Sequence, residues 1–470
     1  MLKFSPKLYS WERTYANDND AYVPEKWALE SLMILKENMV AGNLVHRDFQ
    51  DEIQDYGDVV NTRQPGTFTA VRKTDTDDVT NQDATATNVA VPLDQHLHIS
   101  FMLKDGEMSK SFKDLVTEHL EPAIVGMAQA MDQIVIGQSY QFLGNVVGKL
   151  ETTTLTRQSV IDVREKMNDN NVPFQGRNLL VSSAVEGQLL NIADFVNAEK
   201  VGDDGTALRE GSLGRKFGID IYMDQFVPSI AIGNSITSGA INGGNLIVGS
   251  TTLTVDGFTG SLTAGSWCTI VGDMIPQFIT SISDDTSGNT TAIVVSPGLA
   301  TAVVDDAVVT VYDPGAVNLL AGYAAAYGKA IIVDGFTVSA RQGQLITFGT
   351  ATNKYQAINS LDADSAAVPS TTGLVLDRPL DAGIVNDAVV GIGPQGEYCF
   401  GFHRNALSLV NRPLALPESG GVLASVINDG TTAMRVVIDY DSKSQGHRVT
   451  VDTLCGVKVL NTSLGVVMLG

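Results

Sequence analysis

Apolar residues recur at helical spacing in three segments of the first 200 residues. The first segment starts at Pro24, which suits the first turn of a helix, and ends near Gly42, a plausible residue just after the last turn. Another starts at Thr156, a favourable N-cap, and ends at the polar run 168–171. We predict a helix in each of these two, with its apolar stripe facing a core. The stripe residues are Ala28, Leu29, Leu32, Leu35, Met39 and Val40 in the first helix, and Val160, Val163 and Met167 in the other.

The longest helical pattern lies between these two and runs from about residue 111 to Phe142. Ser111 and Asp114 resemble a capping box at its start. Pro122 should either kink the helix or begin a new one, because proline lacks the backbone N–H that a helix interior needs. This length is near the upper end for a helix of a globular domain. The apolar stripe consists of Leu115, Leu120, Ile124, Met127, Met131, Ile134 and Val135.

Residues 58–100 have the pattern of extended strands around a polar stretch. The sequence DVVNTRQPGTFTAVRK has β-forming residues on both sides of a turn, and VAVPLDQHLHISFML then returns as a strand. We predict one long hairpin that projects from a body. Arg63, Arg72 and Lys73 lie in this hairpin. They are either part of a solvated charged loop or groups that meet acidic patches on a neighbouring subunit.

Shorter segments complete the predicted body. NLLVS at 178–182 predicts a buried strand, and Ser183 with Glu186 predicts the start of another helix. GRKFGIDIYMDQFVP predicts a loop followed by a strand. Near the end of the chain, TTAMRVVIDYDSKSQGHRVTVDTLCGVKVLN predicts two strands joined by a turn at SKSQG. The last residues, VVMLG, are apolar, so we expect them to be packed or paired.

The middle of the chain contains an internal repeat. VDGFT occurs at 255–259 and again at 333–337, which is 78 positions later. DDAVV at 305–309 corresponds to NDAVV at 386–390, which is 81 positions later. The order of the strand-like and turn-like segments is the same in both copies. We predict a tandem duplication of an all-β unit of ~80 residues, each unit a small barrel or sandwich, inserted between Pro228 and about Tyr398.

The chain is acidic, and its charge is unevenly distributed. The formal net charge is −22, only 18% of the residues are charged, and there is no lysine or arginine from Phe217 to Gly328. An acidic chain repels phosphate, so bulk binding of nucleic acid is not predicted. The low charge and the 45 glycines fit a β-rich protein or one that buries much of its surface in an assembly.

Several functional classes find no support in the sequence. The N-terminus lacks the apolar region of a signal peptide, and no apolar run approaches the ~18 residues of a membrane helix. Cys268, Cys399 and Cys455 are far apart, so neither a zinc site nor a disulfide scaffold is indicated. We therefore expect a chain that is made and folded in a cytoplasm and has no membrane contact.

No combination of residues predicts catalysis, a cofactor or a metal site. GIGPQG at 391–396 matches G-x-G-x-x-G, but strand-like sequence follows it, so a turn is favoured over a pyrophosphate site. His96 and His98 would share one face of a strand without a further ligand, and we interpret them, and also His403, as structural. We expect no enzyme activity. The paired acids lie in predicted turns, at Asp77–Asp78, Asp203–Asp204, Asp284–Asp285 and Asp305–Asp306.

The segments outside the repeat resemble the major capsid proteins of tailed bacteriophages. The subgroup most similar to this chain is the coat proteins that carry an inserted β-domain. These segments cover about 300 residues, and none of them is a catalytic motif. The family typically carries one inserted unit, whereas this chain has two. The resemblance is carried by ENMVAGNLVHRDFQDEIQDYGDVVNTRQPG, EHLEPAIVGMAQAMDQIVIG, GRNLLVSSAVEGQLL, GRKFGIDIYMDQFVP, FHRNALSLVNRPLALP and MRVVIDYDSKSQGHRVTVDTLCGVKVL.

The resemblance implies an α+β fold with axial and peripheral domains, a spine helix, an N-terminal arm and an extended loop, here with two tandem all-β inserted units. It implies assembly contacts through Trp11 and Tyr15 in the arm and through Arg63, Arg72 and Lys73 in the loop. The chain would then divide into an N-terminal arm (1–23), a first helix region (24–57), an extended hairpin loop (58–100), the spine helix with the peripheral and axial body (101–230), inserted β-unit 1 (231–314), inserted β-unit 2 (315–397) and a C-terminal return into the body (398–470).

The function that the resemblance implies is structural. Copies of the chain would assemble into hexamers and pentamers of an icosahedral capsid around double-stranded DNA, which is enclosed without sequence-specific binding. Scaffolding and portal proteins would be partners, and the virion capsid would be assembled in the host cytoplasm. Two alternatives stay open. One is the shell of an encapsulin-type protein nanocompartment. The other is a carbohydrate-binding or adhesion protein built on the β-units, which needs exposed aromatic residues, although Trp267 is the only tryptophan of the repeat region.

Overall fold

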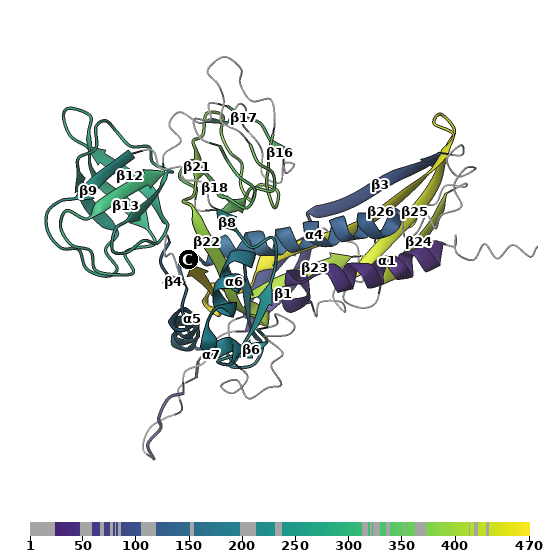
Figure 1. The fold of residues 1–470 in the computed structure, drawn as a ribbon, viewed down its shortest axis with the longest axis horizontal. Helices are drawn as coiled ribbons and strands as arrows, with labels where there is room; N and C mark the ends of the chain where they lie inside the picture. The colour runs from purple at the N-terminus through teal and green to yellow at the C-terminus, as the bar shows by residue number, and fades with distance from the viewer. Residues whose placement is uncertain are drawn as a thin grey trace, which may run out of the picture.

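The computed structural model has an α+β body with two β-rich units on one side (Figure 1). The residues that the structure describes are 24–47, 59–65, 70–75, 79, 81–82, 86–104, 119–150, 155–197, 213–230, 237–312, 318–319, 322, 330–334, 339–351, 353–361, 373–412, 414–417, 422–428 and 432–470.

The first predicted helix is confirmed, but it ends earlier than expected. Helix α1 spans Pro24–Asn38, and a separate turn, α2 (Ala41–Leu44), follows it. Gly42 therefore lies inside α2 rather than after the last turn of α1. Most of the predicted stripe is buried, but Leu29 is 53% exposed, because it lies at the edge of the apolar face.

The longest helix, α4, spans Glu121–Gly137 and continues as a 3-10 turn, η4 (Gln138–Phe142). Pro122 lies in the first turn of α4, where its missing backbone N–H removes no helical hydrogen bond. Residues 119 and 120 before it are π-helical, and 105–118 lie outside the described residues. The predicted stripe from Ile124 to Val135 is buried. The capping box predicted at Ser111 and Asp114 lies outside the described residues.

Three further helices lie near the C-terminus of the chain in space (Figure 1). Helix α5 spans Arg157–Asp169, and Thr156 is its N-cap, as predicted; with Ser159 it also forms a capping box, which was not predicted. Helix α6 spans Ser183–Leu190, but its N-cap is Ser182, one residue before the predicted position. A short turn, α7 (Ala193–Val196), follows.

Helices α1 and α4 cover one face of a five-stranded sheet (Figure 1). The sheet consists of β23 (Leu407–Arg412), β26 (Gly446–Val459), β25 (Ala433–Asp441) and β24 (Leu423–Asn428), with β3 (Gln95–Lys104) on the opposite edge of β26. Side chains alternate across it, so Val449 and Val451 are buried while Arg448 points away from the helices. The turn predicted at SKSQG joins β25 to β26.

A second, mixed sheet forms the other half of the body. Its order is β4 (Val146–Gly148), β27 (Gly465–Leu469), β22 (Gly396–His403), β5 (Arg177–Val181), β7 (Ile219–Met223) and β6 (Arg215–Lys216), and β8 (Ser229–Ile230) pairs with β22. The predicted strand at 178–182 is confirmed as β5, and every residue of β5 is buried. The apolar C-terminus is paired, as β27, between β4 and β22.

The predicted hairpin at 58–100 is only partly correct. Strands β1 (Val59–Pro65) and β2 (Ala86–Pro92) pair antiparallel and form a two-stranded ribbon. The chain then turns, and residues 95–104 leave the ribbon as β3 to pair with β26. The prediction of one returning strand was wrong, because Pro92 interrupts it and the apolar face of β3 packs, partly buried, against the main core beside α4. The base of the ribbon is held by a small cluster of Val60, Val91, Leu93 and Val410.

The first β-rich unit is a closed barrel, formed within residues 237–312 (teal in Figure 1). The strands follow the order β10 (Thr252–Asp256), β13 (Thr290–Ser296), β12 (Gln277–Asp284), β11 (Trp267–Ile270), β14 (Val308–Tyr312) and β9 (Thr237–Ile241). Its interior is a separate apolar core that includes Cys268, Ile270 and Val309. We call residues 237–312 the barrel.

The second β-rich unit, for which we use the described residues of 318–392, is built from short strand pairs around its own core. The strands are β15 (Asn318–Leu319), β16 (Ala330–Ile331), β17 (Val333–Asp334), β18 (Leu345–Phe348), β19 (Tyr355–Gln356), β20 (Leu374–Val375) and β21 (Val390–Ile392). β18 lies between β19 and β21. We call this part the second unit.

The two units repeat the same backbone pairing. In the barrel, Cys268 pairs with Gln277 and Ile270 pairs with Val309. In the second unit, Ile346 pairs with Tyr355 and Phe348 pairs with Val390. The first three of these positions are shifted by 78 residues and the last by 81, as in the sequence repeat.

A turn is repeated as well. Asp306 and Asp387, 81 positions apart, both have a φ of 62°, a left-handed conformation that non-glycine residues seldom adopt. The repeat read from VDGFT and DDAVV therefore extends to main-chain register and turn conformation.

Candidate assembly surfaces and domain junctions

The described residues hold no recognisable reaction centre. No group of three or more His, Cys, Asp or Glu side chains within them could hold a metal ion. The G-x-G-x-x-G match links β21 to β22, with no helix after it, so the prediction of a turn is confirmed. Cys268, Cys399 and Cys455 are buried free thiols. Within the same residues, no helix is long and apolar enough to cross a membrane.

The five residues predicted as assembly contacts are only partly described. Trp11 and Tyr15 lie outside the described residues. Arg63 lies on β1, opposite Asn88 of β2. Arg72 and Lys73 are exposed, and so is their neighbour Val71, with 63% of its surface accessible. The structure therefore places the two cations next to an exposed apolar side chain, between the two strands of the ribbon in sequence.

The outer face of the five-stranded sheet is polar and cross-linked. Arg435 donates from Nε to Asp452 Oδ1 at 2.9 Å, and Arg448 donates from Nε to Asp439 Oδ1 at 3.0 Å. His96 Nε2 lies 3.5 Å from Asp452 Oδ2, which makes this histidine part of the same face. The interpretation of His96 as polar surface fits this position. Cross-strand pairs of opposite charge stabilise a sheet that faces water on one side.

A buried carboxylate fixes the corner between α1 and α2. Asp132 of α4 accepts hydrogen bonds from the backbone N–H groups of Val40 at 2.7 Å and Gly42 at 2.8 Å. The pKa of Asp132 is raised to about 7, first by burial and then by the nearby carboxylate of Asp224, while the two N–H groups and Arg47 oppose the shift. Burial also raises the pKa of Asp224. No pattern in the sequence pointed to this pair of buried acids.

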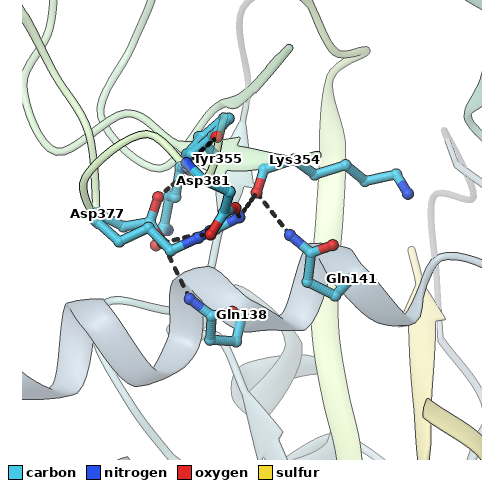
Figure 2. Close-up of polar contacts among 8 residues, drawn as sticks. Gln138, Gln141, Lys354, Tyr355, Asp377 and Asp381 are labelled. Atoms are coloured by element: carbon cyan, nitrogen blue, oxygen red, sulfur yellow. Dashed lines mark hydrogen bonds and ion pairs between the residues drawn. The ribbon is translucent and has the colours of Figure 1, made fainter. Parts of the chain in front are cut away.

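A second set of buried polar groups joins the second unit to the end of α4 (Figure 2). Arg378 donates to Asp377 at 3.0 Å and to Asp381 at 3.0 Å, and its NH2 group also donates to the carbonyl of Lys354 at 2.7 Å. Its guanidinium carbon lies 4.4 Å from the centre of the Tyr355 ring. Asp377 is fully buried, so burial raises its pKa, and Arg378 opposes the shift.

The end of α4 and η4 contact this cluster directly. Gln138 donates to Asp377 at 3.4 Å, and Gln141 donates to the carbonyl of Lys354 at 2.8 Å. Tyr140 donates from its hydroxyl to the carbonyl of Gly343 at 2.6 Å. Gly137 has no room for a side chain, because a Cβ would lie 2.6 Å from Asp377 Oδ2. The sequence signal for this anchor is weak: a charged pair inside the apolar run LVLDRPL.

A groove of about 770 Å³ opens beside this junction. The ribbon base, α4 with η4, the second unit and the end of β26 all contribute to its walls. Gln95 is buried in one wall, and its side-chain amide has no hydrogen-bond partner within the described part of the chain. Apolar residues such as Ile134, Leu380 and Val459 alternate with these polar groups.

The barrel contacts the second unit through Trp267. This side chain is fully buried on the outside of the barrel, and its Nε1 donates to Thr347 Oγ1 at 3.1 Å. It also packs on Phe278, with ring centroids 5.3 Å apart. The only tryptophan of the repeat region is therefore unavailable as a sugar-binding platform.

Comparison with known proteins gave matches among solved structures alone; no family model and no curated protein matches the chain. A structure of Mycobacterium phage Che8 is 12% identical, covers 92% of this chain and 90% of its own, and has a TM-score of 0.41. The capsid of Cyanophage P-SCSP1u is 10% identical over 88% and 84% of the two chains, with a TM-score of 0.41. The capsid of Ralstonia phage GP4 is 8% identical over 89% and 84%, with a TM-score of 0.40.

Proposed function

We propose that this chain is the major capsid protein of a tailed bacteriophage, a structural protein whose copies assemble into hexamers and pentamers of an icosahedral shell around double-stranded DNA. The observation that carries the proposal is the β1–β2 ribbon. Within the described residues, its two strands pair only with each other, and Val71, Arg72 and Lys73 beyond them are exposed. A two-stranded ribbon is marginally stable alone in water, and only its base packs on Val410 of the body, so contact with the surface of another chain would stabilise the rest.

The geometry of a closed shell supplies that surface. In a ring of identical subunits, each subunit offers one surface to the copy before it and a different one to the copy after it. A projecting ribbon fits such a heterologous contact, and many weak contacts of this kind stabilise a shell together. The sequence resemblance to tailed-phage coat proteins points the same way. A structural role also fits the lack of a reaction centre among the described residues.

We propose further that residues 231–397 are an insertion into the capsid body. The two strands that flank this region support the proposal: Ser229 pairs with Glu397, and Ile230 pairs with Gly396. The chain thus leaves and re-enters the body at neighbouring positions, as an inserted domain requires. The remaining divisions are an arm at 1–23 and an extended loop that ends near Pro92 instead of at 100, because residues 95–104 belong to the five-stranded sheet. The barrel would face the shell exterior, since it is acidic and has no lysine or arginine.

The partners follow from the same proposal. The net charge of −22 disfavours tight binding of DNA to the wall, so packaged DNA would be enclosed without sequence-specific contacts. Scaffolding and portal proteins would take part in assembly in the host cytoplasm, and the mature location would be the virion capsid. A carbohydrate-binding role loses its main candidate residue, since Trp267 is buried.

Electron microscopy of native particles that contain this chain, together with the ratio of absorbance at 260 and 280 nm, tests the proposal. Closed shells with nucleic acid inside are the expected result. Closed shells that hold protein cargo would overturn the capsid proposal in favour of an encapsulin-type nanocompartment. A chain that stays monomeric under all conditions would overturn shell assembly altogether.

A further inference from the structure

The shared register of the two β-units allows their surfaces to be compared position by position. Strand β18 corresponds to β11 at an offset of 78, and β21 corresponds to β14 at an offset of 81. The comparison shows where the two copies have diverged. The second unit has contacts on two sides, and several of the residues that form them are replaced in the barrel, namely Asp377, Arg378, Gly349 and Gly391.

One side of the second unit faces the body. Gly343 accepts the hydrogen bond from Tyr140, and Leu345 belongs to the main apolar core of the body. The buried pair Asp377 and Arg378 holds the same side on the end of α4. The barrel residues at the corresponding positions are uncharged. They are Ser296 and Pro297 at an offset of 81, or Leu299 and Ala300 at an offset of 78. The barrel therefore has no equivalent of the anchor.

The other side of the second unit faces the barrel. A Cβ on Gly391 would overlap the carbonyl oxygen of Gly265 and would lie 2.5 Å from Thr347 Oγ1. A Cβ on Gly265 would overlap the carbonyl oxygen of Gly349. The two main chains are thus in direct contact at three glycines, next to the hydrogen bond from Trp267 to Thr347.

This glycine surface is specific to the second unit. The barrel residues that correspond to Gly349 and Gly391 are Val271 and Thr310. Their side chains would keep another main chain away, because a backbone can approach this closely only where Cβ is absent. The position of Gly265 in the barrel corresponds to that of Gly343 in the second unit. The same edge of the repeat therefore docks twice, once on the second unit and once on the body.

We propose that the second unit is an adaptor whose function is to bind the barrel on its glycine surface and the end of α4 on its opposite surface. The two copies of the repeat then have different roles: the closed barrel is the part that is held, and the open second unit holds it on the body. The partner that fits the surface of Thr347, Gly349 and Gly391 is the barrel edge with Gly265 and Trp267. This inference goes beyond the proposed function and does not depend on it, since all of these contacts lie within one chain.

The barrel also contacts the body directly, so it stays attached to the body when the contact with the second unit is disrupted. Leu150 donates from its backbone to the carbonyl of Met274 at 2.9 Å, and Lys149 contacts the carbonyl of Gly272. Trp267, Ile275, Phe278 and Tyr312 of the barrel also belong to the main apolar core, which includes Tyr398 of the body. The barrel is therefore held by the body directly as well as by the glycine surface of the second unit.

Trp267 reports on the adaptor contact because it is buried there. The chain has three tryptophans, so Trp11→Phe with Trp27→Phe leaves Trp267 as the only one. In this background, Gly391→Ala should separate the surfaces. We expect a red shift of the emission and a severalfold rise in the acrylamide quenching constant. Gly373→Ala is the matched control, because a Cβ there has no neighbour closer than 3.5 Å.

The adaptor proposal would be overturned if the quenching constant of Trp267 were the same in the Gly391→Ala chain and in its parent. It would also be overturned if the Gly373→Ala control showed the same rise in quenching as Gly391→Ala. If Gly391→Ala fails to fold, as judged by circular dichroism, Thr347→Val takes its place. That change removes the acceptor for Trp267 and keeps the volume, so a smaller rise in quenching is expected and no rise would count against the proposal. All of these measurements use the soluble full-length chain, so a failure of shell assembly leaves them readable.

Discussion

The carboxylate of Asp132 accepts a hydrogen bond from the backbone N–H of Gly42 at 2.8 Å, although the two residues are 90 positions apart in sequence. A second bond from Val40 makes this carboxylate the fixed point on which the α1–α2 corner rests. The contact joins the start of the body to the middle of α4. It also places the Asp132 carboxyl in a buried position near a second acid, Asp224, and both the burial and this neighbour raise its pKa.

The stability of the body should depend on pH through Asp132. Its pKa is about 7 in the folded chain and about 3.8 when unfolded, so the folded state binds more protons between these values. The contribution of Asp132 to the free energy of unfolding should therefore be fully present below pH 4 and be lost as pH rises to 7, by at most about 1.4 kcal/mol per pH unit. Asp224, whose pKa is also raised, acts in the same direction.

Asp132→Asn should flatten this dependence, as measured by urea unfolding at several pH values between 4.5 and 7.5. Asp285→Asn is the control, because this exposed barrel carboxyl has a lowered pKa and titrates below the window. A parent chain whose stability does not fall between pH 4.5 and 7 would contradict the assignment to a buried acid.

Two glycines of α4 should respond to alanine in opposite directions. Gly137→Ala places a Cβ 2.6 Å from Asp377 Oδ2, against a cluster that is already closed, so it should destabilise the chain by about 1–3 kcal/mol. Gly126→Ala meets only Ile99 at 3.6 Å, and alanine favours a helix, so it should stabilise by about 0.5–1 kcal/mol. Thermal unfolding of the two variants side by side checks the pair. Equal effects of the two changes would mean that α4 does not touch Asp377.

The buried ion pair should be far more costly to break than a surface pair. Arg378→Ala leaves Asp377 buried without its partner, which should lower the free energy of unfolding by about 3–5 kcal/mol. The matched change is Arg157→Ala, which removes the exposed pair with Asp194 and should cost less than about 1 kcal/mol. Denaturant titration of both variants compares the two losses. Similar losses would show that the Arg378 cluster is solvated.

The cations beside the ribbon should matter for assembly rather than for the folded chain. Arg72→Glu with Lys73→Glu should leave the melting temperature of the soluble chain unchanged, because both side chains are exposed. The yield of closed particles by sedimentation should fall, and added salt should weaken the difference between variant and parent. Lys443→Glu, an exposed lysine in the β25–β26 turn, is the control for a change of charge alone. Normal particle yield from the double variant would remove these residues from the interface.

The amino-acid sequence by itself determined the features that depend on local pattern. The N-cap at Thr156, the buried strand predicted at 178–182 and the tandem repeat are examples. Local periodicity, turn residues and caps act over a few positions, so they can be recognised without knowing what packs against them.

The tertiary structure decided which segments meet. Residues 95–104 looked like the return of a hairpin, yet they pair with β26, because the sheet under α4 buries their apolar face. The Asp377–Arg378 anchor is stable only where Gly137 and Gln138 close over it. A charged residue within an apolar stretch of sequence can be either buried or solvated. Which of these occurs depends on residues that are distant in the sequence and contact it in the fold. Pairing between distant segments depends on the total apolar area buried, which no single window of the sequence contains.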